Sequence, residues 1–123
     1  METLLIVDDE IGLAQGLARL LRRDGYSVDT ASNGRQALAR LETQEYHLLL
    51  CDLRMPELDG PGLYQAVASR WPHLVSRFVF LTGDALSPDI RDFLEQTGLP
   101  RLIKPFTAAE GRRVVRQALL AQR

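Results

Sequence analysis

The chain has 123 residues, enough for one domain with a hydrophobic core, and its composition (46% hydrophobic, 25% charged) is that of an ordinary globular protein. With 15 basic and 16 acidic residues, the formal charge of −1 does not indicate nucleic-acid or membrane-surface binding. The single cysteine, Cys51, excludes an internal disulfide, and the sequence contains neither a membrane-length apolar run nor a signal peptide. We therefore expect one cytoplasmic domain over residues 1–123.

Five short apolar runs predict β-strands, each followed by a segment with helical periodicity. The first run, residues 3–7, is apolar throughout and is bounded by acids, as expected of a strand covered on both faces. The other strands are expected over 26–31, 47–51, 77–82 and 101–103. Five β-α units without a hairpin signal imply a parallel sheet with helices on both faces.

The intervening segments carry helix start and stop signals. The first helix is expected over 11–23, ending near Asp24-Gly25, and its predicted buried stripe consists of Leu13, Leu17, Leu20 and Leu21. The third helix should be short and end before Pro72. Predicted first residues or N-caps of the other helices are Asn33, Ser87-Pro88 and Thr107.

Four of the predicted strands end in residues that carry chemistry: Asp8-Asp9, Asp52, Thr82 and Lys104. Ligands of parallel α/β sheets bind beyond the carboxyl ends of the strands, so these side chains should meet. Carboxylates brought together repel one another, and Mg²⁺, which prefers oxygen ligands, would relieve that repulsion. An ammonium and a hydroxyl beside them suit phosphoryl transfer onto Asp52, the nucleophile.

The chain is similar to the receiver domains of two-component response regulators. Four collinear segments carry the resemblance: "LLIVDDE" (4–10), "LLCDLRMPELDGPGL" (49–63), "FLTGDA" (80–85) and "LIKPFT" (102–107). Each motif is weak alone, but the four occur in order over nearly the whole chain. The resemblance implies an α/β, flavodoxin-like (βα)5 sandwich with a parallel five-stranded sheet in the order 2-1-3-4-5.

The resemblance also implies roles for individual residues. Asp52 would be the phospho-acceptor, and Asp8 and Asp9 would bind Mg²⁺ directly or through water, with Asp9 the direct ligand. The backbone carbonyl of Arg54 would complete the protein ligands. Lys104 would contact the phosphoryl group.

The remaining implied features concern signalling. Thr82 would move to bond the phosphoryl oxygen, Gly83 would leave room beside the site, and the bond from Lys104 to Pro105 would be cis. Arg54 and Asp84 stand where the family tunes dephosphorylation through water access. Arg101 departs from the family, which carries Tyr, Phe or His at this position, so output through the face of the fourth helix, fifth strand and fifth helix is expected to be altered or weak.

The expected function is transfer of a phosphoryl group from a histidine kinase or histidine phosphotransfer protein to Asp52, with slow self-hydrolysis. A homodimer through the face just named is a further expectation, and the chain could be the receiver of a hybrid sensor kinase.

Three alternatives remain at this point. A haloacid-dehalogenase-like phosphatase also uses an aspartyl phosphate, but it requires an acid two residues after the nucleophile, where this chain has Arg54. A degenerate interaction module is favoured only by Arg101. Taken singly, Asp8, Asp9 and Glu10 could simply be acids at a helix N-terminus. In the same way, Asp52 could cap a turn, Thr82 could be an ordinary strand-end residue and Lys104 a solvated surface residue.

Overall fold

The computed structural model describes residues 1–122, which contain a five-stranded, all-parallel sheet. Its strands are β1 (Thr3–Val7), β2 (Ser27–Ala31), β3 (Leu48–Asp52), β4 (Phe78–Thr82) and β5 (Arg101–Ile103). The strand order β2-β1-β3-β4-β5 confirms the expected flavodoxin-like arrangement. All five predicted strands are present, with bounds that differ by at most one residue at either end.

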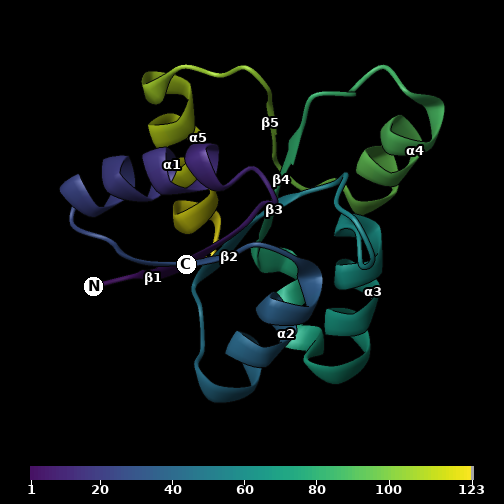
Figure 1. Cartoon of the computed structure of the whole chain (residues 1–123), viewed down its shortest axis with the longest axis horizontal. Coiled ribbons are helices and arrows are strands. Elements are labelled where there is room, and N and C mark those ends of the chain that lie inside the picture. The colour runs from purple at the N-terminus through teal and green to yellow at the C-terminus, as the bar shows by residue number, and fades with distance from the viewer. Residues whose placement is uncertain (123) are drawn as a thin grey trace.

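Helices cover both faces of the sheet (Figure 1). They are α1 (Ile11–Arg23), α2 (Gly34–Thr43), α3 (Gly60–Arg70), α4 (Pro88–Thr97) and α5 (Ala108–Ala121). One apolar cluster joins α1 and α5 to one face, and a second joins α2, α3 and α4 to the other. A short 3-10 helix, η1 (Pro72–Arg77), was not predicted. No helix within residues 1–122 is long and apolar enough to cross a membrane.

The central strands are the most deeply buried part of the chain. Every residue of β3 and β4 is buried, because helices cover these strands on both faces and neighbouring strands flank them. The edge strand β5 is different, since only Leu102 is buried and Arg101 and Ile103 are exposed. The apolar run before Asp52 therefore ends in the middle of the sheet.

The predicted stripe of α1 was only partly correct. Leu17 and Leu21 are buried, whereas Leu13 and Leu20 are partly exposed. Ala14 and Ala18 lie in the core in their place. Small side chains let a helix approach the sheet closely, so the wider leucines remain at the margin of the contact.

Candidate functional site at the carboxyl edge of the sheet

Strand register brings the predicted residues to one edge. Val7 pairs with Cys51, so the residues that follow them, Asp8 just beyond β1 and Asp52 at the last position of β3, lie side by side. Thr82 pairs with Ile103, which places Lys104 at the same edge. Parallel pairing alone thus gathers residues that are nearly one hundred positions apart in the chain.

The turn after β3 is shaped to bring α3 against the end of the strand. The Gly60 N–H donates to the Leu53 carbonyl at 3.1 Å. A Cβ at Gly60 would lie 2.7 Å from the Asp52 carbonyl oxygen, so only glycine fits this close approach. Asp59 caps α3 by accepting from the Gly62 N–H at 2.8 Å. These residues fix the position of Asp52 from the C-terminal side.

Lys104 is the common partner of the acids at this edge. Its Nζ lies 2.9 Å from Asp8 Oδ2, 2.9 Å from Glu10 Oε1 and 3.5 Å from Asp52 Oδ2. The contact with Glu10 is a hydrogen bond, whereas the contact with Asp8 is an ion pair without hydrogen-bond geometry. Its peptide bond to Pro105 is cis, as the family resemblance implied. One cation therefore balances three carboxylates.

The carboxylates at this edge fit a hard cation. Single oxygen atoms of Asp8, Glu10 and Asp52 lie within 4.8 Å of one another. Asp8 Oδ2 is buried and has no hydrogen-bond partner among residues 1–122. A buried carboxylate oxygen of this kind is a donor that Mg²⁺ accepts. A cavity of about 290 Å³ lies at this edge, and the exposed Asp9 lines it together with Glu10, Asp52 and Lys104.

Glu10 is the one member of this cluster that sequence reasoning gave no role. It follows Asp8-Asp9 directly, and a third acid in a row at the start of a helix is a common pattern. The side chain is exposed over 62% of its surface, yet it reaches Lys104. Only the fold shows this contact, because the two residues are 94 positions apart.

Burial and neighbouring charge act on Asp52 together. Burial raises the pKa of Asp52, the Asp8 carboxylate raises it further, and the net pKa is about 6 even though Lys104 and a backbone hydrogen bond from Arg54 oppose the shift. Burial alone would lower the pKa of Lys104, but the neighbouring carboxylates of Asp8, Glu10 and Asp52 outweigh it and raise that pKa. Without a second cation, the site therefore holds its negative charge at a cost.

The β4 end supplies a buried hydroxyl and a short loop. Thr82 is fully buried, and its Oγ1 accepts a hydrogen bond from the Asp84 backbone N–H at 3.0 Å. A Cβ at Gly83 would come no closer to another side chain than 3.9 Å, to Lys104, so Gly83 is not sterically required here. The loop leads directly into α4.

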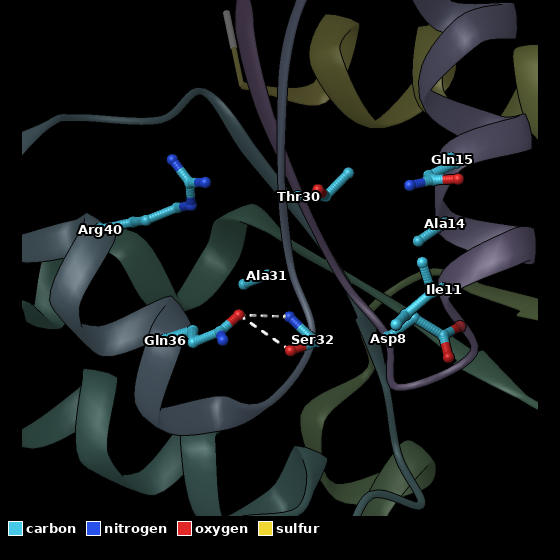
Figure 2. Close-up of a pocket in the computed structure, with 9 residues that line it drawn as sticks. All are labelled: Asp8, Ile11, Ala14, Gln15, Thr30, Ala31, Ser32, Gln36 and Arg40. Atoms are coloured by element: carbon cyan, nitrogen blue, oxygen red, sulfur yellow. Dashed lines mark hydrogen bonds between the residues drawn. The ribbon is translucent and has the colours of Figure 1, made fainter.

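A second hollow of about 280 Å³ lies between β2 and the first turns of α1 and α2 (Figure 2). Gln36 reaches across it, and its Oε1 accepts from the Ser32 N–H at 2.8 Å and from the Ser32 hydroxyl at 2.9 Å. Gln36 and Ser32 thus satisfy each other's hydrogen bonds, and Asp8 is the only acid that lines this hollow. The acidic edge is therefore the stronger candidate for chemistry.

Comparison with known sequences agrees with this site. The profile of the family described as "Response regulator receiver domain" matches residues 4–116. The chain belongs to this family, whose members are the receiver domains of two-component signalling.

Three relatives illustrate the kinds of protein that contain a similar domain. Transcriptional regulatory protein ZraR of Escherichia coli (strain K12) is 35% identical over 103 residues, which is 84% of this chain and 23% of ZraR. Hydrogenase transcriptional regulatory protein HoxA of Cupriavidus necator is 35% identical over 121 residues, 98% of this chain and 24% of HoxA. Sensor kinase CckA of Brucella abortus is 31% identical over 122 residues, 98% of this chain and 13% of CckA. The chain thus spans a quarter or less of each relative.

Solved structures give the same result. Chemotaxis protein CheY4 of Vibrio cholerae superposes with a TM-score of 0.86 at 28% identity, covering 96% of this chain and 98% of that chain. The signal receiver domain of a signal transduction histidine kinase from Syntrophus aciditrophicus gives 0.87 at 26% identity, covering 98% and 92%. Close structural neighbours therefore come from both a chemotaxis protein and a kinase.

Proposed function

We propose that residues 1–123 form a receiver domain in which Asp52 accepts a phosphoryl group from a phosphohistidine. The donor would be a histidine kinase or a histidine phosphotransfer protein. A single observation carries the proposal: Asp52 is buried at the centre of the sheet edge, 3.5 Å from Lys104, beside a second buried acid. A carboxylate held in this way is strongly suited to react with an electrophile and poorly suited to a purely structural role.

Atoms and charge balance in the proposed step. An oxygen of the Asp52 carboxylate attacks phosphorus, the P–N bond to the donor imidazole breaks, and the imidazole leaves with the bonding electrons and takes up a proton. Lys104 leaves Asp8 or Glu10 to bind a phosphoryl oxygen, and Thr82 turns its hydroxyl toward another. Water later attacks the aspartyl phosphate, which returns the carboxylate and releases inorganic phosphate.

Mg²⁺ is the cofactor that we propose for this step. Asp8, Asp9, Asp52 and the backbone carbonyl of Arg54 would hold it, and when bound it would neutralise the charge of the incoming phosphoryl oxygens. The buried Asp8 Oδ2, whose close partner among residues 1–122 is the Lys104 ammonium, supports this assignment, because its remaining lone pair is open to a cation. The raised pKa of Asp52 supports it as well, because a divalent cation favours the ionised carboxylate.

We further propose a homodimer through the face formed by α4, β5 and α5. Asp92 and Glu95 are exposed on α4, whereas Arg113 and Arg116 are exposed on α5. In a two-fold dimer the acidic helix of one copy can meet the basic helix of the other. Light scattering before and after phosphorylation tests this arrangement, and charge reversal of Arg113 and Arg116 together should abolish any dimer.

The central experiment uses a small-molecule phosphodonor such as acetyl phosphate together with Mg²⁺. Intact mass should show the addition of one phosphoryl group to the wild type and none to Asp52→Asn. EDTA should prevent the reaction. An unmodified wild-type protein would instead favour the interaction module without turnover, and a label that persists on Asp52→Asn would place the acceptor elsewhere.

A further inference from the structure

The first turn of α4, like that of α1, has no side-chain cap within residues 1–122, in contrast to α2, α3 and α5. Asn33 caps α2 and Asp59 caps α3, and each side chain accepts a hydrogen bond from its own helix. The α5 helix begins with a complete capping box at Thr107. Ser87 precedes α4 but makes no such hydrogen bond within residues 1–122. Something other than a cap must hold this turn in place.

The Ser87 hydroxyl is instead directed into a network around Arg54. It donates a short hydrogen bond to Asp89 Oδ1. Arg54 Nη2 lies 3.0 Å from Asp84 Oδ2, 3.2 Å from the Ser87 hydroxyl and 3.4 Å from Asp89 Oδ1. A single guanidinium on the loop after β3 therefore holds both the loop after β4 and the start of α4.

The backbone of Arg54, in contrast to its side chain, contacts the phospho-acceptor Asp52. Arg54 follows Asp52 by two residues, and a backbone hydrogen bond from Arg54 acts on the Asp52 carboxylate. Asp84 is tied to the site a second time, because its backbone N–H donates to Thr82. Both contacts depend on the atoms that a phosphoryl group on Asp52 would disturb.

Resting on the proposed function, we propose that Arg54 is a positioning residue that transmits the state of Asp52 to α4. Phosphorylation draws the Arg54 backbone and the Thr82 hydroxyl toward the acceptor, and the first turn of α4 is released or shifted through Asp84 and Asp89. The path needs no aromatic side chain on β5. It therefore serves a chain that carries an exposed Arg101 at that position.

The ion pairs of this network are weak enough to break during signalling. Its side chains are about half exposed or more: Arg54 over 53% of its surface, Asp84 over 52% and Asp89 over 68%. Exposed ion pairs are individually weak, so this network can be broken and remade within one signalling event. Three partners on one guanidinium still favour a single position of the turn.

The test compares amide NMR spectra with and without beryllium fluoride and Mg²⁺, an aspartyl-phosphate mimic. In the wild type, shifts should appear at Leu53 beside the acceptor and along α4. The α4 response is divided by the Leu53 response in the same sample, so altered binding is taken into account. In Arg54→Ala this ratio should fall by about threefold or more, and Arg54→Lys, which keeps the charge, should recover part of it. Asp89→Asn acts from the far end and should reduce the ratio by a smaller factor.

Arg35→Ala is the matched control. Arg35, on α2, forms an exposed ion pair at 3.9 Å with Glu57, which lies in the loop after β3 that also carries Arg54, but this pair does not reach α4. The ratio in this variant should equal that of the wild type. An unchanged ratio in Arg54→Ala overturns the proposed path while leaving phospho-acceptance intact. Absence of any Leu53 response in the wild type, together with no phosphoryl addition by mass, would instead refute the proposed function.

Discussion

The acidic edge around Asp52 and the face formed by α4, β5 and α5 use charge in opposite ways. At the edge, Asp8 is fully buried and Lys104 is 13% exposed, and the carboxylates of Asp8, Glu10 and Asp52 all lie within 3.5 Å of the Lys104 ammonium. On the face, Arg101 is exposed and has no ion pair within residues 1–122, and Ile103 is 52% exposed. Buried charges must be balanced to keep the fold, whereas exposed charges can change with little effect on stability.

The largest effect should follow removal of the shared cation. Lys104→Met leaves Asp8 and Asp52 buried without a counter-ion, so the free energy of unfolding near neutral pH should fall by about 3 kcal/mol in EDTA. Urea unfolding measures it. Arg112→Ala is the control, because its ion pair with Asp24 is more exposed and should be worth under about 1 kcal/mol. Equal losses of unfolding free energy in the two variants would show that the buried ion pairs of the edge stabilise the fold no more than an exposed pair does.

A gain of stability should follow neutralisation of the acceptor. Burial and Asp8 raise the pKa of Asp52 to about 6, above that of the unfolded chain, so the folded protein binds this proton more tightly. Stability is then lost as pH rises from the unfolded value toward about 6 and does not return above it. In EDTA at neutral pH, Asp52→Asn should be more stable than the wild type by about 2 kcal/mol.

This advantage should shrink as the pH falls from about 6 toward about 4, because the folded wild type then holds the proton and its unfolded chain begins to take it up. Asp92→Asn, which removes an exposed acid on α4, should show no comparable gain at either pH. A wild type that is as stable as Asp52→Asn at neutral pH would show that Lys104 already balances the cluster.

A smaller effect is expected from the metal. If Asp8 and Asp52 bind Mg²⁺, concentrations several times the dissociation constant should raise the free energy of unfolding by about 1 kcal/mol. Thermal unfolding with and without millimolar Mg²⁺ measures the shift. Asp8→Asn should lose most of it while keeping the fold. A wild-type melting temperature unaffected by Mg²⁺ would contradict the proposed metal site.

Sequence patterns predicted most of the fold and little of the site's internal contacts. Apolar runs ending at Asp8 and Asp52 were recognisable because central parallel strands are buried on both faces, and the cis bond before Pro105 followed from the family resemblance. The contacts of Glu10 with Lys104 and of Arg54 with Asp89 were not predictable, since they join residues 94 and 35 positions apart through side-chain placement. Periodicity reports which face is buried, not which polar partner a long side chain selects.

The smallest effect concerns Arg101 and decides how the two regions communicate. Because Arg101 is exposed, Arg101→Ala should change the free energy of unfolding by less than about 0.5 kcal/mol. Its sequence position predicts weak output through β5, whereas the Arg54 network predicts that α4 still responds. In the beryllium fluoride experiment, Arg101→Ala should therefore keep the wild-type ratio of α4 to Leu53 shifts. A ratio that falls in Arg101→Ala but is unchanged in Arg54→Ala would contradict the Arg54 path. It would show that the response of α4 depends on β5, with Arg101 in the role of the aromatic residue that the family carries there.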